Sequence, residues 1–121
     1  MMKDCIFCRI AAGKAPAKHL GSWISTAVIE PLNPVTPGHL IVIPRAHVAD
    51  AVEDPSVTAT VMHDAAMCVS MVRRFDARYE SVNFITSVGV PATQSVFHLH
   101  IHIVPRAIDD GLTLPWTGQK R

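Results

Sequence analysis

The chain has 121 residues, of which 11 are Lys or Arg and 10 are Asp or Glu, and 49% of them are hydrophobic. This length and apolar content predict one folded domain over residues 1–121 and exclude disorder. The net charge of +1 argues against a nucleic-acid partner, because phosphate-binding surfaces usually show a basic excess. No apolar run approaches the roughly 18 residues of a membrane span. The N-terminus also lacks the apolar stretch of a secretory signal, so we expect a cytoplasmic protein with no membrane partner.

The first half of the chain predicts one short helix and two strands. Cys5 to Ala12 is a short helix candidate, and Gly13 is placed to end it. Trp23 to Glu30 is rich in Trp, Ile, Thr and Val, which predicts a strand. Three prolines between Pro31 and Gly38 indicate a rigid connection, and His39 to Ile43 predicts the next strand.

The second half predicts one long helix and two further strands. Asp54-Pro55 is typical of a helix start, and apolar residues recur from Val57 to Tyr79 at steps of three and four, which predicts about six helical turns. Val82 to Val88 and Val96 to Val104 each predict a strand, with a loop at Val90 to Thr93. We therefore expect an α+β fold: a mainly antiparallel sheet with one long and one short helix on one of its faces.

Three histidines alternate with apolar residues in the stretch His98-Leu99-His100-Ile101-His102-Ile103. Successive side chains of a strand point to opposite faces, so the three imidazoles would share one face, with neighbouring Cα atoms roughly 6.6 Å apart. A solvated polar face would explain a single such histidine. Three of them at a period of two favour a functional site, because histidine is a common general base, nucleophile and metal ligand.

This stretch resembles the signature of the histidine triad (HIT) family, in which histidines alternate with apolar residues. Three further segments are similar to that family and occur in the same order: Asp4 to Ile10, Asn33 to His47, and Gln94 to Phe97. The resemblance implies a HIT-like fold. It also implies a nucleotidyl hydrolase or transferase, which cleaves a nucleoside monophosphate from a leaving group at the α-phosphorus.

The resemblance implies roles for individual residues. His100 is the expected nucleophile, because a neutral imidazole forms a phosphoramidate that is itself labile. His102 and Gln94 would hydrogen-bond phosphate oxygens, the Ser95 hydroxyl would face the phosphate or the leaving group, and His39 would lie beside the nucleophile. For His39 the alternative is a strand-start histidine satisfied by nearby backbone. The expected substrate-binding residues are Gln94, Ser87, Glu30, Leu32, Asn33 and Ile10.

Cys5-x-x-Cys8 has the spacing of a metal site, a redox pair or two buried small apolar residues. A redox pair of the thioredoxin kind needs a βαβ context, and the residues before Cys5 offer no strand. A structural zinc site commonly takes two Cys and two His, and the resemblance implies His47 and His98 as the other two ligands. We therefore expect a closed structural Zn²⁺ site and no organic cofactor, with Cys68 in the core.

The expected nucleoside pocket departs from the family pattern. The position eight residues before His39, which usually holds the ribose through Asp or Asn, is Pro31. Either Glu30 takes that role after a shift of one residue, or ribose binding differs. Ser87 stands where Asn is usual, and Thr93 where Gly is frequent. These changes leave substrate preference open, but not the phosphoryl chemistry.

The leading interpretation is a hydrolase for a purine nucleoside 5′-phosphoramidate or a related adenylated compound. The alternatives are a dinucleoside polyphosphate hydrolase or phosphorylase, such as one for diadenosine tetraphosphate, and a non-catalytic nucleotide-binding protein. A zinc-storage module would explain neither Gln94 nor the block that contains His39.

The long helix also predicts a homodimer. Its apolar stripe can cover the sheet, so Met67 and Met71 would lie on the far side, where leftover apolar residues often mark an interface. The alternative is that two exposed methionines are ordinary surface scatter. The resemblance implies pairing through this helix and a nearby strand. Trp116 lies in a C-terminal segment that loosely resembles a family tail reaching the partner's site.

Overall fold

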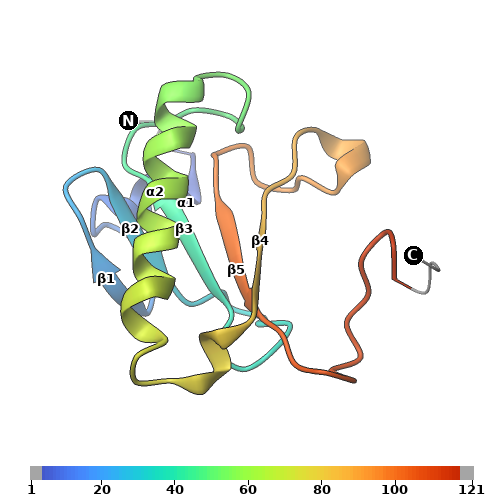
Figure 1. Cartoon of the computed structure of the whole chain (residues 1–121). Helices are drawn as coiled ribbons and strands as arrows, with labels where there is room; N and C mark the ends of the chain where they lie inside the picture. The colour runs from blue at the N-terminus through green and yellow to red at the C-terminus, as the bar shows by residue number, and fades with distance from the viewer. Residues whose placement is uncertain (1–3, 118–121) are drawn as a thin grey trace.

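The computed structural model describes residues 4–117, and its strands form one five-stranded sheet in which every neighbouring pair is antiparallel (Figure 1). The strands are β1 (His19–Ser22), β2 (Thr26–Ile29), β3 (Leu40–Pro44), β4 (Val82–Ile85) and β5 (Ile101–Pro105). Their spatial order is β1-β2-β3-β5-β4. The α+β class and the antiparallel sheet are therefore confirmed.

The helices are the short α1 (Ile6–Ala11), the long α2 (Pro55–Val72) and two 3-10 helices, η1 (Ala77–Glu80) and η2 (Val90–Ala92). The sulfur of Cys5 caps α1 by accepting the backbone N–H of Cys8. The carboxylate of Asp54 caps α2 in the usual way, accepting the first backbone N–H groups of the helix. Within residues 4–117, none of the helices combines the length and apolar character that crossing a bilayer requires.

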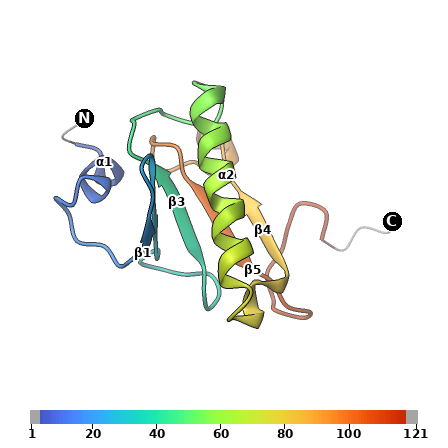
Figure 2. The ribbon, with the colours of Figure 1, turned by 60° about the vertical axis from the view of Figure 1, so that its left-hand side comes forward.

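The expectation that both helices lie on one face of the sheet is wrong, because they cover opposite faces (Figure 2). Val28 and Leu40 face the core under α2, whereas Ala27, Ile29 and Ile41 face the core under α1. Every residue of β2 and β3 is buried. An uninterrupted apolar run of this kind indicates a strand covered on both sides.

The long helix is shorter than its apolar periodicity predicts. It ends at Val72, and Phe75, which the pattern assigns to the buried stripe, is 91% exposed. The chain turns there because the carboxylate of Asp76 accepts the backbone N–H of Arg78 and starts η1. Tyr79 is then buried from η1, where its hydroxyl donates to the carbonyl of Gly38.

The predicted strands are also longer than the observed ones. The segment Trp23–Glu30 contributes only β2, which pairs with β1, a strand that the sequence did not indicate. The segment Val96–Val104 contributes to β5 only from Ile101. The residues before it leave the ladder because the backbone N–H of Leu99 donates to the carbonyl of Val48 at 2.8 Å. This bond brings the start of the histidine stretch against the segment that follows β3.

Candidate active site and metal centre

Three imidazoles lie in a row on the sheet face that α1 covers. His102 is on β5 opposite Ile41 of β3, His100 directly precedes β5, and His39 directly precedes β3. The ring centroid of His102 is 5.1 Å from that of His39 and 5.1 Å from that of His100. The pairing of β3 with β5 thus joins histidines that lie far apart in the sequence.

Backbone partners decide which nitrogen of each neutral ring carries the proton. The N–H of Val35 donates to Nδ1 of His39 at 3.1 Å, so His39 is protonated at Nε2, which donates to Nδ1 of His102 at 2.9 Å. His102 therefore carries its own proton on Nε2. Nδ1 of His100 lies 2.8 Å from the carbonyl of His98, an acceptor only, and so holds the proton of that ring. Nε2 of His100 is left with a free lone pair.

Burial keeps the rings of His39 and His102 uncharged near neutral pH. His39 is 5% exposed, and its burial lowers its pKa. Burial, followed by the nearby His100 and His39 rings, lowers the pKa of His102 to about 4. The pair therefore presents a neutral N–H donor rather than a cation.

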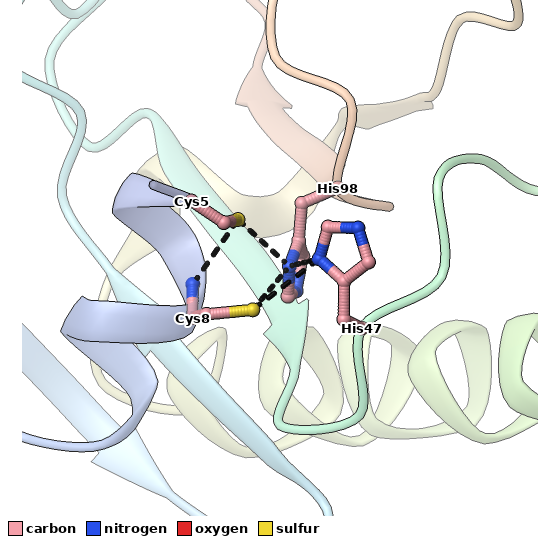
Figure 3. Close-up of side chains that lie close together, drawn as sticks. All are labelled: Cys5, Cys8, His47 and His98. Atoms are coloured by element: carbon pink, nitrogen blue, oxygen red, sulfur yellow. Dashed lines mark hydrogen bonds between the residues drawn. The ribbon is translucent and has the colours of Figure 1, made fainter. Parts of the chain in front are cut away.

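A second cluster gathers two sulfurs and two ring nitrogens (Figure 3). Cys5 and Cys8 reach it from the start of α1, His47 from the segment after β3, and His98 from the segment before β5. Nδ1 of His98 lies 3.3 Å from the sulfur of Cys5, 3.4 Å from that of Cys8 and 3.2 Å from Nδ1 of His47. All four atoms lie within 4.8 Å of one another, which is the convergence that a single cation requires.

The donor set fits a tetrahedral metal ion. Ligands at ordinary Zn–N and Zn–S distances are separated by roughly 3.3–3.8 Å in a tetrahedron, close to the separations in this cluster. Nε2 of His98 lies 2.8 Å from the carbonyl of Pro44, so it carries the proton and leaves Nδ1 as a lone pair aimed at the sulfurs. Burial raises the pKa of the Cys5 thiol, so its thiolate needs a neighbouring cation. The three cysteines, Cys5, Cys8 and Cys68, are free thiols, and Cys68 lies in the core under α2.

The expected substrate-binding residues come from several different elements. Ile10 is buried from α1 in the core with Ile29 and Ile41. Leu32 and Asn33 are exposed on the loop that leads to His39, and Leu32 is 98% exposed. Ser87 is half-buried in the segment after β4. Ser95, the expected catalytic hydroxyl, is exposed in the segment after η2.

Gln94 is tied into the loop that precedes the histidine stretch. Its side-chain oxygen accepts the N–H of Gly89 at 2.8 Å, and its nitrogen donates to the carbonyls of Ala49 at 2.7 Å and Val96 at 3.1 Å. Both N–H groups of the amide are therefore engaged. A hydrogen bond from Gln94 to a phosphate would require one of these bonds to break.

The structure places Glu30, one of two alternatives for the ribose position, away from the histidine row. Glu30 follows β2 on the face that α2 covers, where it pairs with Lys18 at 3.4 Å and lines a hollow with Leu40 and Tyr79. The histidine row lies on the other face, and side chains alternate along a strand, so a shift of one residue exchanges the faces. This placement favours the second alternative, in which ribose binding does not use Glu30.

One contact of the site was missed. The ring of Phe7 packs against the rings of His98 and His100, with centroid distances of 5.9 and 5.1 Å. The only signal in the sequence was its position between Cys5 and Cys8.

Comparison with known proteins identifies the family. The HIT domain model matches residues 13–108. Adenylylsulfatase HINT3 of Arabidopsis thaliana is 31% identical over 112 residues, which are 93% of this chain but 57% of that protein. This chain thus spans little more than half the length of that relative.

Two solved structures are similar over most of this chain. A Zn-bound histidine triad family protein from Mycobacterium smegmatis gives a TM-score of 0.80 at 32% identity, covering 91% of this chain and 80% of that one. A Streptococcus mutans protein gives a TM-score of 0.88 at 27% identity, covering 100% of this chain and 77% of that one. With the domain match over residues 13–108, these findings show that the chain belongs to the histidine triad (HIT) family.

Proposed function

We propose that this protein is a nucleotidyl hydrolase or transferase that works through a covalent nucleotidyl intermediate on His100, and that its substrate is a purine nucleoside 5′-phosphoramidate. Membership of the HIT family supports a hydrolase that binds nucleotides. The single observation that carries the mechanism is the contact of Nδ1 of His100 with the carbonyl of His98, which leaves Nε2 as a lone pair on a ring whose centroid is 5.1 Å from that of His102. A nucleophile and a phosphate donor thus lie side by side.

The proposed reaction has two displacements. The lone pair of His100 attacks the α-phosphorus, an N–P bond forms, and the bond to the leaving amine breaks with its electron pair on the amine, which takes up a proton. Water then attacks the same phosphorus and releases a proton to solvent, the N–P bond breaks with its electron pair returning to Nε2 of His100, and the nucleoside monophosphate leaves. The Nε2–H of His102 donates to a phosphate oxygen as charge builds there, and the Ser95 hydroxyl serves the leaving group.

His39 is proposed to act through His102. By donating to Nδ1 of His102, it keeps the proton of that ring on the nitrogen that faces the phosphate. Burial holds the pKa of both rings below its usual range, so the donor stays neutral near pH 7. The adenylylated substrate class is supported by the name of the Arabidopsis relative, an adenylylsulfatase.

We also propose that Cys5, Cys8, His47 and His98 hold a structural Zn²⁺. Four of the donor pairs lie 3.2–3.4 Å apart, close to the spacing in a tetrahedral site, and these separations and the Zn-bound relative from Mycobacterium smegmatis support it. A closed zinc site with four protein ligands supplies folding energy rather than a reactive water. It would tie the start of α1 to the segment that leads into β5.

A homodimer completes the proposal. Met67 and Met71 on α2 are 43% and 47% exposed. Phe84 is 36% exposed on β4, the strand at one edge of the sheet. Phe84 lines a surface hollow between α2 and β4, together with Ala66, Val69, Ser70, Arg73, Glu80, Ser81 and Val82. Met71 lines a different hollow, between α2 and β1. Apolar residues beside an open sheet edge favour contact with a second copy of the chain.

Replacement of the nucleophile tests the chemistry. We expect His100→Ala to lower the release of AMP from an adenosine 5′-phosphoramidate by about a thousandfold or more, because a missing nucleophile removes the covalent path. When the reaction of the wild-type enzyme is stopped without acid, mass spectrometry should find an AMP adduct on the peptide that contains His100. His63→Ala, an exposed histidine on α2, is the matched control and should keep full activity.

Two outcomes would contradict the assignment: a His100→Ala variant that keeps a tenth of wild-type activity, or an adduct on another residue. A panel that adds diadenosine tetraphosphate and an acyl-adenylate decides the substrate class. Faster turnover of diadenosine tetraphosphate would replace the phosphoramidase assignment but leave the covalent mechanism in place. Nucleotide binding without turnover of any substrate would indicate a binding protein.

A further inference from the structure

Phe7 stands between the metal centre and the histidine row. It is the second residue of α1, is 8% exposed, and lies directly before Cys8. Its ring makes an edge contact with His98 of the metal cluster, at 5.9 Å and 85° between planes. It makes a second contact with His100, at 5.1 Å and 68°. One apolar ring therefore touches both sites.

His100 needs such a contact to be held in one orientation. Its Nδ1–H donates to the carbonyl of His98, which fixes one atom of the ring. A single hydrogen bond leaves the ring free to swing about that bond, and this would move the Nε2 lone pair relative to the Nε2–H of His102. The edge of the Phe7 ring restricts that motion, since aromatic rings prefer this tilted arrangement.

Phe7 packs in the core under α1 with Ile29 and Ile41, and contacts at the two ends of α1 fix the helix that carries it. A helix of six residues is too short to be stable alone, so its contacts hold it. At its C-terminal end, the guanidinium of Arg45 donates to the carbonyl of Ala11 at 2.6 Å. At its N-terminal end, where Phe7 lies, Cys5 and Cys8 belong to the metal cluster.

We propose that Phe7 is a positioning residue for His100, and that it makes the orientation of the nucleophile depend on the metal centre. The inference rests on the proposed nucleotidyl transfer for its catalytic consequence. With Cys5 and Cys8 bound to the metal, the start of α1 is fixed and Phe7 presses on the His100 ring. Without the metal, Arg45 still holds the end of α1, but the start that carries Phe7 is released.

The test compares Phe7→Leu with Ile6→Ala, which changes the neighbouring residue of α1, 42% exposed. We expect Phe7→Leu to keep its zinc and to lower kcat by about a hundredfold with little change in KM, because a small misplacement of a reacting group has effects of that size. The imidazole nitrogen signals of His100 in NMR spectra should shift or broaden in zinc-loaded Phe7→Leu. The same signals should change when a chelator removes zinc from the wild type, and Ile6→Ala should match the wild type throughout.

Other results would overturn the proposal. An unchanged kcat, or a change in KM alone, would mean that Phe7 contacts only the substrate. Loss of zinc from Phe7→Leu would mean that Phe7 supports the metal site itself. If the stripped wild type unfolds, the zinc-loaded Phe7→Leu spectrum decides alone, and unchanged His100 signals there reject the role. A wild type that releases no AMP rejects the proposed function, while the spectra still test the positioning.

Discussion

At the scale of single residues, backbone groups give otherwise similar histidines different roles. His98 donates to the carbonyl of Pro44 and turns Nδ1 to the metal cluster, whereas His100 donates from Nδ1 and keeps Nε2 free. The alternating sequence identifies these rings as a group. It cannot assign their protons, because partners come from distant segments, such as Pro44 for His98. The sequence also could not tell which face of the sheet Glu30 occupies, because a shift of one residue along a strand moves a side chain to the opposite face.

The buried His102 should make the fold less stable in acid. Its pKa is about 4 in the folded protein against an ordinary value of 6.5, so the unfolded chain binds more protons between these values. The free energy of unfolding should therefore fall as the pH drops from about 6.5 to about 4, by about 3 kcal/mol at most, and then level off in this respect. Urea unfolding of the wild type and of His102→Gln, each at pH 7 and at pH 4.5, measures this change in the free energy of unfolding. Equal pH dependence in the two proteins would show that His102 does not contribute.

At the scale of elements, local patterns predicted where helices and strands lie, and long-range bonds decided where they end. The capping signals of α2 and the alternation before Pro105 were readable in the sequence. The early end of α2 and the late start of β5 were not, because they follow from the turn at Asp76 and from the bond between Leu99 and Val48. Because Leu99 and Val48 directly follow His98 and His47, the same bond also brings those two histidines together at the metal cluster.

Removal of one metal ligand should release α1. We expect Cys8→Ser to lose its zinc and to melt at least about 10 °C lower than the wild type, because binding energy at a structural site is folding energy. Cys68→Ser is the matched control, since Cys8 is 1% and Cys68 3% exposed but Cys68 lies outside the cluster. Elemental analysis and thermal unfolding with and without a chelator provide the measurement. A chelator should lower the melting temperature of the wild type and Cys68→Ser, but not that of Cys8→Ser.

A metal-free wild type with the same melting temperature would remove Cys5, Cys8, His47 and His98 from the ligand set together. Retention of zinc by Cys8→Ser would instead point to a ligand set without Cys8.

At the scale of the whole molecule, the sheet separates two tasks. The face under α1 carries the histidine row and the metal cluster, and the face under α2 carries the larger apolar core. The mainly apolar sequences of β2 and β3 already indicated that both faces of the sheet are covered, because a strand with apolar side chains on both faces must be buried on both. The strand order and the presence of β1 required the structure, since both depend on pairings between segments of weak local signal.

The open edge at β4 and the exposed methionines of α2 lead to the last prediction, a dimer in solution. Met67→Glu places a charge on the exposed side of α2, four residues from Met71, and burying that charge in an interface would be unfavourable. Light scattering at micromolar concentration should give a dimer mass for the wild type and a monomer mass for Met67→Glu. Ile24→Glu, at a residue that is 96% exposed beside β2, should remain a dimer. A monomeric wild type would reject the interface, and with it any reach of Trp116 into a neighbouring site.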